Sequence, residues 1–162
     1  MASTPSPELI LTTTEGDLRA LEQWLTTFHL GSVVLDPFTN ESSWILKTAV
    51  RILNGFRGCD VRVNFVLTCG ADEAKAFLGP IADDFLVFCD PERSFVKSLG
   101  LETLPAFVFL RSDGTVPAAA QGWSPAQWKQ VAAEIARTTA WSQPTIPVTS
   151  DPSPFHGTPA LG

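Results

Sequence analysis

The stretch FLVFCDPERSFVKSLGLETLPAFVFLRSDGTV, residues 85–116, carries the densest structural signals in the chain. It opens with a short apolar run that predicts a buried strand. Asp90-Pro91-Glu92 then predicts a helix start, because aspartate caps helices, proline suits the first turn and acidic residues favour the N-terminus. A second apolar strand begins around Leu104-Pro105, and Asp113-Gly114 is typical of a hairpin turn. This stretch therefore predicts a strand, a short helix, a strand and a hairpin to a last strand.

The residues before this stretch also predict strands and helices in alternation. The clearest strand is VRVNFVL at 61–67, which is rich in β-branched residues. Parallel strands need helical crossovers, so we predict an α/β domain with helices on both faces of a sheet of about five strands. The sheet should be mixed, mostly parallel with antiparallel strands added by the terminal hairpin. The other expected elements are short strands at 9–11 and 32–35 and helices near 16–30, 44–56 and 72–79.

The residues after this stretch divide into one more helix and a segment of different composition. Ser124-Pro125 predicts the start of the last helix. From about residue 142 prolines recur and hydrophobic periodicity ends. The expected organisation is a flexible lead at 1–8, a folded domain at 9–141 and a proline-rich tail at 142–162.

The proline-rich tail has few large apolar side chains. We expect residues beyond about 148 to be mobile in the isolated protein, because no periodic apolar face would hold them. Phe155 and Leu161 are the large hydrophobic residues there, and we predict that they anchor a protein partner.

Composition and charge narrow the classes of partner. The chain has 162 residues, 44% of them hydrophobic, and a formal net charge of −6. An acidic protein repels phosphate backbones and anionic lipid surfaces, so nucleic-acid and membrane partners are not expected. The first residues do not have the pattern of a signal peptide. We therefore expect a cytoplasmic protein with no bound cofactor.

Metal binding is not expected either. The three cysteines, Cys59, Cys69 and Cys89, lack the short spacings of zinc ligands. The two histidines, His29 and His156, are far apart in the sequence.

The order of signals within residues 85–116 resembles the second half of thioredoxin-like proteins. The resemblance is to the form with an inserted βα unit, found in the TlpA-like and peroxiredoxin-like branches. The tripeptide Gln121-Gly122-Trp123 before the last helix also fits. The resemblance covers roughly residues 8–140 and implies a thioredoxin-like three-layer α/β/α sandwich.

The redox motif of that family has no counterpart in this chain. The family carries a Cys-x-x-Cys at the start of the helix after the strand that 33–35 resembles, where the helix N-terminus lowers the thiol pKa. Here Asn40 and Ser43, or alternatively Ser42 and Ile45, take the two cysteine positions. None of these side chains exchanges disulfides, and no peroxidatic cysteine stands in this loop.

A second family feature is retained. The resemblance implies a cis peptide bond at Leu104–Pro105, with the backbone before the proline facing the loop at 36–43. In the family this backbone pairs with an extended peptide. The expected groove is lined by an unpaired backbone edge and by apolar anchors, drawn from Phe38, Trp44, Leu104, Pro105 and Trp123.

Cys69 and Cys89 offer a different chemistry. Each follows an expected strand, and the two strands are joined by one helical crossover, so the sulfur atoms could lie within disulfide reach. The carboxyl edge of such a sheet is where α/β proteins bind ligands. A buried cysteine more often acts as a small hydrophobic residue.

Two functions follow from the sequence. The first is a redox-inactive thioredoxin-like protein that binds another polypeptide as an adaptor, chaperone or assembly factor. It would be similar to the hydrogenase-maturation chaperones, which also lack the cysteine pair. Those chaperones differ from this chain in lacking the strand–helix insert at 61–81. The alternative is a thiol oxidoreductase or peroxidase that uses Cys69 and Cys89.

Overall fold

Nine short strands make up two sheets in the part of the chain that the structure, a computed structural model, describes, residues 3–162. The strands are β1 (Ile10–Thr13), β2 (Leu18–Ala20), β3 (His29–Leu35), β4 (Val61–Leu67), β5 (Leu86–Cys89), β6 (Thr103–Leu104), β7 (Ala106–Leu110), β8 (Ala118–Gln121) and β9 (Thr158–Pro159). Seven of them form the central sheet in the order β2-β1-β5-β4-β3-β7-β8. The other two, β6 and β9, pair with each other.

The central sheet is larger and less parallel than the sequence predicted. The pairs β3–β4 and β4–β5 are parallel, and the remaining neighbours in the sheet are antiparallel. The sheet is mixed, as expected, but it has seven strands instead of about five, and most of its pairings are antiparallel. The N-terminal residues form a hairpin of two short strands, which add to the far side of β5 instead of providing a helical crossover.

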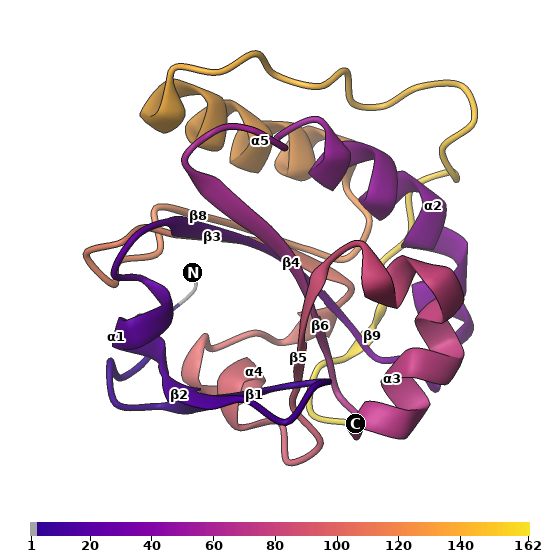
Figure 1. Cartoon of the computed structure of the whole chain (residues 1–162). Helices are drawn as coiled ribbons and strands as arrows, with labels where there is room; N and C mark the ends of the chain where they lie inside the picture. Colours follow the sequence, from indigo (N-terminus) through magenta and orange to yellow (C-terminus); the bar gives the residue numbers. More distant parts are fainter. Residues whose placement is uncertain (1–2) are drawn as a thin grey trace.

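Helices cover both faces of the sheet, as Figure 1 shows. They are α1 (Leu21–Trp24), α2 (Asn40–Asn54), α3 (Ala71–Leu78), the 3₁₀ turn η1 (Gly79–Asp83), α4 (Ser94–Ser98) and α5 (Pro125–Thr139). One face carries α2, α3 and α5, and the other carries the shorter α1 and α4. The expected three-layer α/β/α architecture is confirmed.

Alternation along the strands divides the core into two clusters. On β3, Val33 and Leu35 pack toward α2 and α5, whereas Val34 packs toward α1 and α4. Successive side chains of a strand point to opposite faces, so a strand buried on both faces must be apolar throughout. This explains why β3, β4 and β7 were recognisable as apolar runs.

The expected helix near 16–30 is wrong. Residues 18–20 form β2, and α1 is a single turn. Leu18, which counted toward the helical periodicity, is mostly exposed. A tight turn at Gly16, with φ of +88°, folds the chain back into the hairpin before any helix begins.

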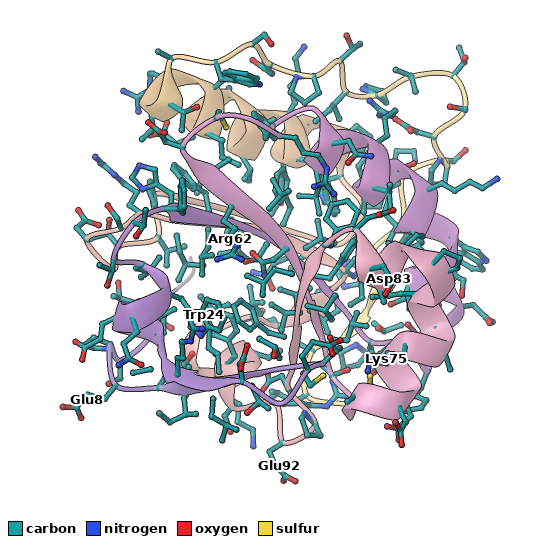
Figure 2. The ribbon with its side chains drawn as sticks, in the orientation of Figure 1. Glu8, Trp24, Arg62, Lys75, Asp83 and Glu92 are labelled. Carbon is teal, nitrogen blue, oxygen red and sulfur yellow. The ribbon has the colours of Figure 1, made fainter. Side chains whose placement is uncertain are left out.

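Trp24 is buried on the face of the sheet that carries α1 and α4. Figure 2 shows Arg62 of β4 close to Trp24, and the two guanidinium carbons of Arg19 and Arg62 lie 4.7 and 5.8 Å from the centroid of the Trp24 ring. The indole packs edge-on against Phe88 with 5.1 Å between ring centroids. Cations over an indole face stabilise its partial burial.

Candidate functional site

The first turn of α2 corresponds to the position at which thioredoxin-like proteins carry the Cys-x-x-Cys motif. Asn40 and Ser43 are exposed there, whereas Ser42 is buried and Ile45 lies in the core. The Ser42 hydroxyl lies 3.2 Å from the Thr39 hydroxyl, which donates to the Asp36 carbonyl oxygen. Ser42 thus helps to hold the loop before α2 against the helix. The exposed residues Asn40 and Ser43 offer only an amide and a hydroxyl.

The loop before α2 is fixed by a buried ion pair. Asp36 follows the last residue of β3, and its carboxylate accepts a hydrogen bond from the Phe38 amide at 3.1 Å. The other carboxylate oxygen lies 2.9 Å from a guanidinium nitrogen of Arg93. Arg93 has a left-handed backbone, with φ of 59°. Sequence analysis missed this pair because its members lie 57 residues apart.

The edge of the expected groove is already paired. The Leu104–Pro105 peptide bond is cis, as expected. The two residues before Pro105 form β6, which pairs antiparallel with β9, so that Thr103 lies opposite Pro159 and Leu104 opposite Thr158. The Ala160 amide also donates to the Glu102 carbonyl oxygen at 2.9 Å. The prediction of an unpaired edge at Leu104 is therefore wrong, because the chain's own C-terminal segment fills it.

We call residues 148–162 the C-terminal segment. Residues 140–147 lead the chain away from α5, and the C-terminal segment then passes α2 and reaches β6 at the opposite end of the molecule (Figure 1). The structure shows this segment docked on the domain through backbone pairs at Phe155, Thr158 and Ala160, whereas its mobility in the isolated protein stays a prediction. Its contacts are made by an extended backbone and a few isolated side chains, and neither produces a periodic pattern in the sequence.

Phe155 lies at the centre of this docked segment. Its amide and carbonyl pair with those of Trp123 at 3.1 and 2.9 Å. Its ring packs edge-on against Trp44, with 5.6 Å between ring centroids. The Trp123 indole donates to the Pro152 carbonyl oxygen at 2.7 Å. Phe155, expected to anchor a partner, thus contacts two of the predicted groove residues of its own chain.

Two glycines allow the backbones to come close. Gly157 has φ of +98°, and a Cβ atom there would fall well inside 3.0 Å of the Leu104 carbonyl oxygen. Gly122, on the groove side, has φ of +70°, and a Cβ atom there would collide with the His156 carbonyl oxygen. Any larger residue at either position would be both strained and obstructed.

A carboxylate clasp fixes the other end of the C-terminal segment. The Asp151 side chain is 2% exposed. One of its oxygens accepts from the Thr48 hydroxyl at 2.8 Å, and the other accepts from Arg51 at 2.7 Å and from the Val148 amide at 2.8 Å. Thr48 and Arg51 lie three residues apart on α2, so they present one small polar face. Sequence analysis did not identify this clasp.

The remaining predicted groove residues fall into two groups. Trp44 is 56% exposed, so it is a surface side chain and not part of the core. Leu104 and Trp123 are almost fully buried, and Trp123 forms the floor beneath the C-terminal segment. Phe38 and Leu161 are both more than half exposed.

The cysteines are three free thiols. Cys89 lies in register with Leu67, two residues before Cys69, so the two strand ends are neighbours. Burial raises the pKa of the Cys69 thiol to about 12, and the proximity of Cys89, Glu73 and Asp36 adds to this rise. Burial also raises the pKa of Cys89. These thiols are protonated at neutral pH, which opposes nucleophilic chemistry.

Between residues 3 and 162, no group of three or more histidine, cysteine or acidic side chains is placed to hold a metal ion. None of the helices there combines the length and the apolar character needed to cross a bilayer.

Comparison with known proteins identifies the fold. No protein-family profile and no curated protein sequence matches the chain. Among solved structures, a hypothetical protein from Sinorhizobium meliloti matches with a TM-score of 0.69 at 16% identity, over 99% of this chain and 94% of that one. Peroxiredoxin Q from Xanthomonas campestris matches with a TM-score of 0.66 at 13% identity, over 85% and 95%. A secreted disulfide oxidoreductase from Mycobacterium tuberculosis matches with a TM-score of 0.57 at 16% identity, over 70% and 83%. The chain shares their fold.

Proposed function

We propose that this chain, which has a thioredoxin-like fold, is a redox-inactive protein that binds an extended segment of another polypeptide. The groove runs from the first turns of α2 to the edge of β6. In the resting state the C-terminal segment fills it, and a partner binds by taking its place.

One observation supports this proposal above the others. The backbone before Pro105 pairs with β9 of the C-terminal segment, and β6 and β9 form a two-stranded sheet apart from the central one. Backbone pairing at a sheet edge is a general way to bind an extended peptide, because main-chain hydrogen bonds supply affinity. The C-terminal segment thus occupies this groove as a peptide ligand would.

The competing function is a thiol oxidoreductase or peroxidase. It is favoured by the names of two structural neighbours, a peroxiredoxin and a disulfide oxidoreductase. It also draws on the position of Cys69 and Cys89 at adjoining strand ends. It is opposed by their burial and by their raised pKa values.

We predict that the purified protein does not reduce insulin disulfides with dithiothreitol or with a thioredoxin reductase. The first turn of α2 has no thiol, and burial raises the pKa of both Cys69 and Cys89, which opposes formation of the reactive thiolate. The turbidity of precipitating insulin measures the reaction, with serum albumin as the control. Turnover well above that control would contradict the proposal, and the Cys69→Ser and Cys89→Ser variants would then locate the activity.

We also predict that the groove binds its ligand in trans once the C-terminal segment is released. In the full-length Gly157→Val variant, the new side chain collides with the Leu104 carbonyl and undocks the segment. A fluorescein-labelled peptide of residues 148–162 should then bind, as measured by anisotropy. The wild-type chain should bind it about a hundredfold more weakly, because a tethered ligand competes at millimolar effective concentration.

Groove-side variants check that the peptide binds where the structure indicates. In the Gly157→Val background, Trp44→Ala should weaken binding by about 2 kcal/mol, the typical loss at a hot spot. Trp44 is exposed, so circular dichroism should show an intact fold. Replacement of all three cysteines by serine should leave binding unchanged. The proposal fails if the released chain binds no peptide, or if binding requires the cysteines.

A further inference from the structure

We infer that the partner segment carries the residue pattern of the C-terminal segment: an acidic residue, an aromatic residue four positions later, a glycine two positions after that and a small residue three further on. This inference rests on the proposed function and deepens it. The four positions correspond to Asp151, Phe155, Gly157 and Ala160.

Glycine is the most stringent of these positions. The backbone of Gly157 is left-handed, and the Leu104 carbonyl oxygen occupies the space where a side chain would begin. That oxygen belongs to the backbone of β6, which pairs with the ligand and cannot rotate away like a flexible side chain. A partner with any other residue at this position cannot form the backbone pairing with β6.

The position of Ala160 accepts only a small side chain. Ala160 is 1% exposed and packs in the same cluster as Leu104 and the α4 side chains. Its amide donates to the Glu102 carbonyl, and its carbonyl oxygen accepts from Arg93 at 2.6 Å. With its backbone held on both sides, a larger side chain at this position has no way to turn outward.

The acidic and aromatic positions supply affinity. Asp151 meets Arg51 and Thr48, so a partner that lacks a carboxylate leaves these two donors without their acceptor. The aromatic ring meets Trp44 edge-on, an arrangement worth about 0.5–1.5 kcal/mol beyond the area it buries.

The intervening positions are open to variation. The side chains of Ser153, Pro154, His156, Pro159 and Leu161 are exposed in the docked segment. They set the spacing but meet no restrictive surface. The structure therefore specifies four positions of a ten-residue segment and leaves four exposed ones free, namely Ser153, Pro154, His156 and Pro159. The two remaining positions, Pro152 and Thr158, are half-buried.

The test uses the full-length Gly157→Val chain and unlabelled synthetic peptides that compete with the labelled peptide of residues 148–162. Relative to the native peptide, the Gly157→Val peptide should bind at least about a hundredfold more weakly. Phe155→Ala and Ala160→Leu should each cost about ten- to thirtyfold, the loss typical of buried anchors, and Asp151→Ala about 30- to 150-fold, because it leaves Arg51 and Thr48 without their acceptor. Matched controls at exposed positions, Ser153→Ala and His156→Ala, should change affinity less than about twofold.

The outcomes separate this inference from the proposed function. If the native peptide binds but all variants bind equally, the residue pattern is wrong and the groove remains a general peptide site. If the native peptide does not bind, both fail. A second released chain, Ala160→Arg, guards against a folding defect particular to Gly157→Val, and circular dichroism of both chains confirms that the domain is folded. If the Gly157→Val and Ala160→Arg chains rank the peptides in the same order of affinity, the result supports the four-residue pattern.

Discussion

Cys69 in the native protein is expected to react with iodoacetamide at pH 7.5 at least about a thousandfold more slowly than in the urea-unfolded chain. The reason is its ionisation. Burial raises the pKa of the thiol from 9.0 to about 12, and the thiolate is the reactive form. Three pKa units correspond to about a thousandfold smaller thiolate fraction, and the 3% exposure of the residue slows the reaction further.

The same shift predicts a dependence of stability on pH. Because the folded pKa of Cys69 is the higher one, its protonated form is favoured by folding. This contribution is fully present below about pH 9, where the unfolded thiol is still protonated. It is lost as pH rises from about 9 toward about 12, at about 1.4 kcal/mol per pH unit in the free energy of unfolding. The Cys69→Ala variant should show a smaller decrease over that range in urea titrations.

Mass spectrometry of alkylated peptides reads all three cysteines in one experiment. Cys59, which is partly exposed, provides an internal comparison. Rapid labelling of Cys69 or Cys89 in the folded protein at neutral pH would mean that a thiolate is accessible. It would favour the oxidoreductase alternative over the peptide-binding proposal.

Replacing Asp151 by alanine is expected to weaken docking of the C-terminal segment by about 2–3 kcal/mol. The substitution removes three hydrogen bonds and leaves Arg51 and Thr48 without their acceptor. Arg51 is partly exposed, so water recovers some of the loss and the effect stays below that of a fully buried pair. Amide exchange at Phe155 and Ala160 should accelerate roughly 30- to 150-fold.

Two control variants interpret this experiment. Ser153→Ala, at an exposed position of the same segment, should leave exchange unchanged. Asp151→Asn keeps the shape and part of the hydrogen bonding, so its effect should be intermediate. If the amides of Phe155 and Ala160 exchange at the wild-type rate in Asp151→Ala, the clasp does not hold the segment.

The sheet and the long helices could be predicted from the sequence because their signals are local. The apolar runs of β4 and β7 reflect burial on both faces. Ser124-Pro125 was recognised at the start of α5, where the Ser124 side chain accepts from the Gln127 amide. By contrast, α1 is a single turn with one leucine, Leu21, and the helical spacing of Leu18 and Leu21 spans the end of a hairpin instead of one helix.

The groove could be predicted only in part, because its contacts join distant residues through the backbone. Trp44 and Leu104 were identified through a family resemblance. The contributions of Arg93 and Asp151 depend on partners 57 and 100 residues away, respectively. Gly157 lies in a proline-rich stretch, and nothing in its sequence neighbours indicates that a carbonyl oxygen faces it.

The C-terminal segment is held at two separate places, at Asp151 on α2 and at Ala160 beside Arg93. A strand fixed in this way can peel from one end while the other stays attached. Under the proposed function, the partner segment would first pair with the backbone freed at residues 102–104. It would then advance toward Phe155 and displace the C-terminal segment one hydrogen-bonded pair at a time. The rate at which the partner replaces the C-terminal segment would therefore rise with the concentration of the partner. It would not be limited by the rate at which the C-terminal segment undocks completely.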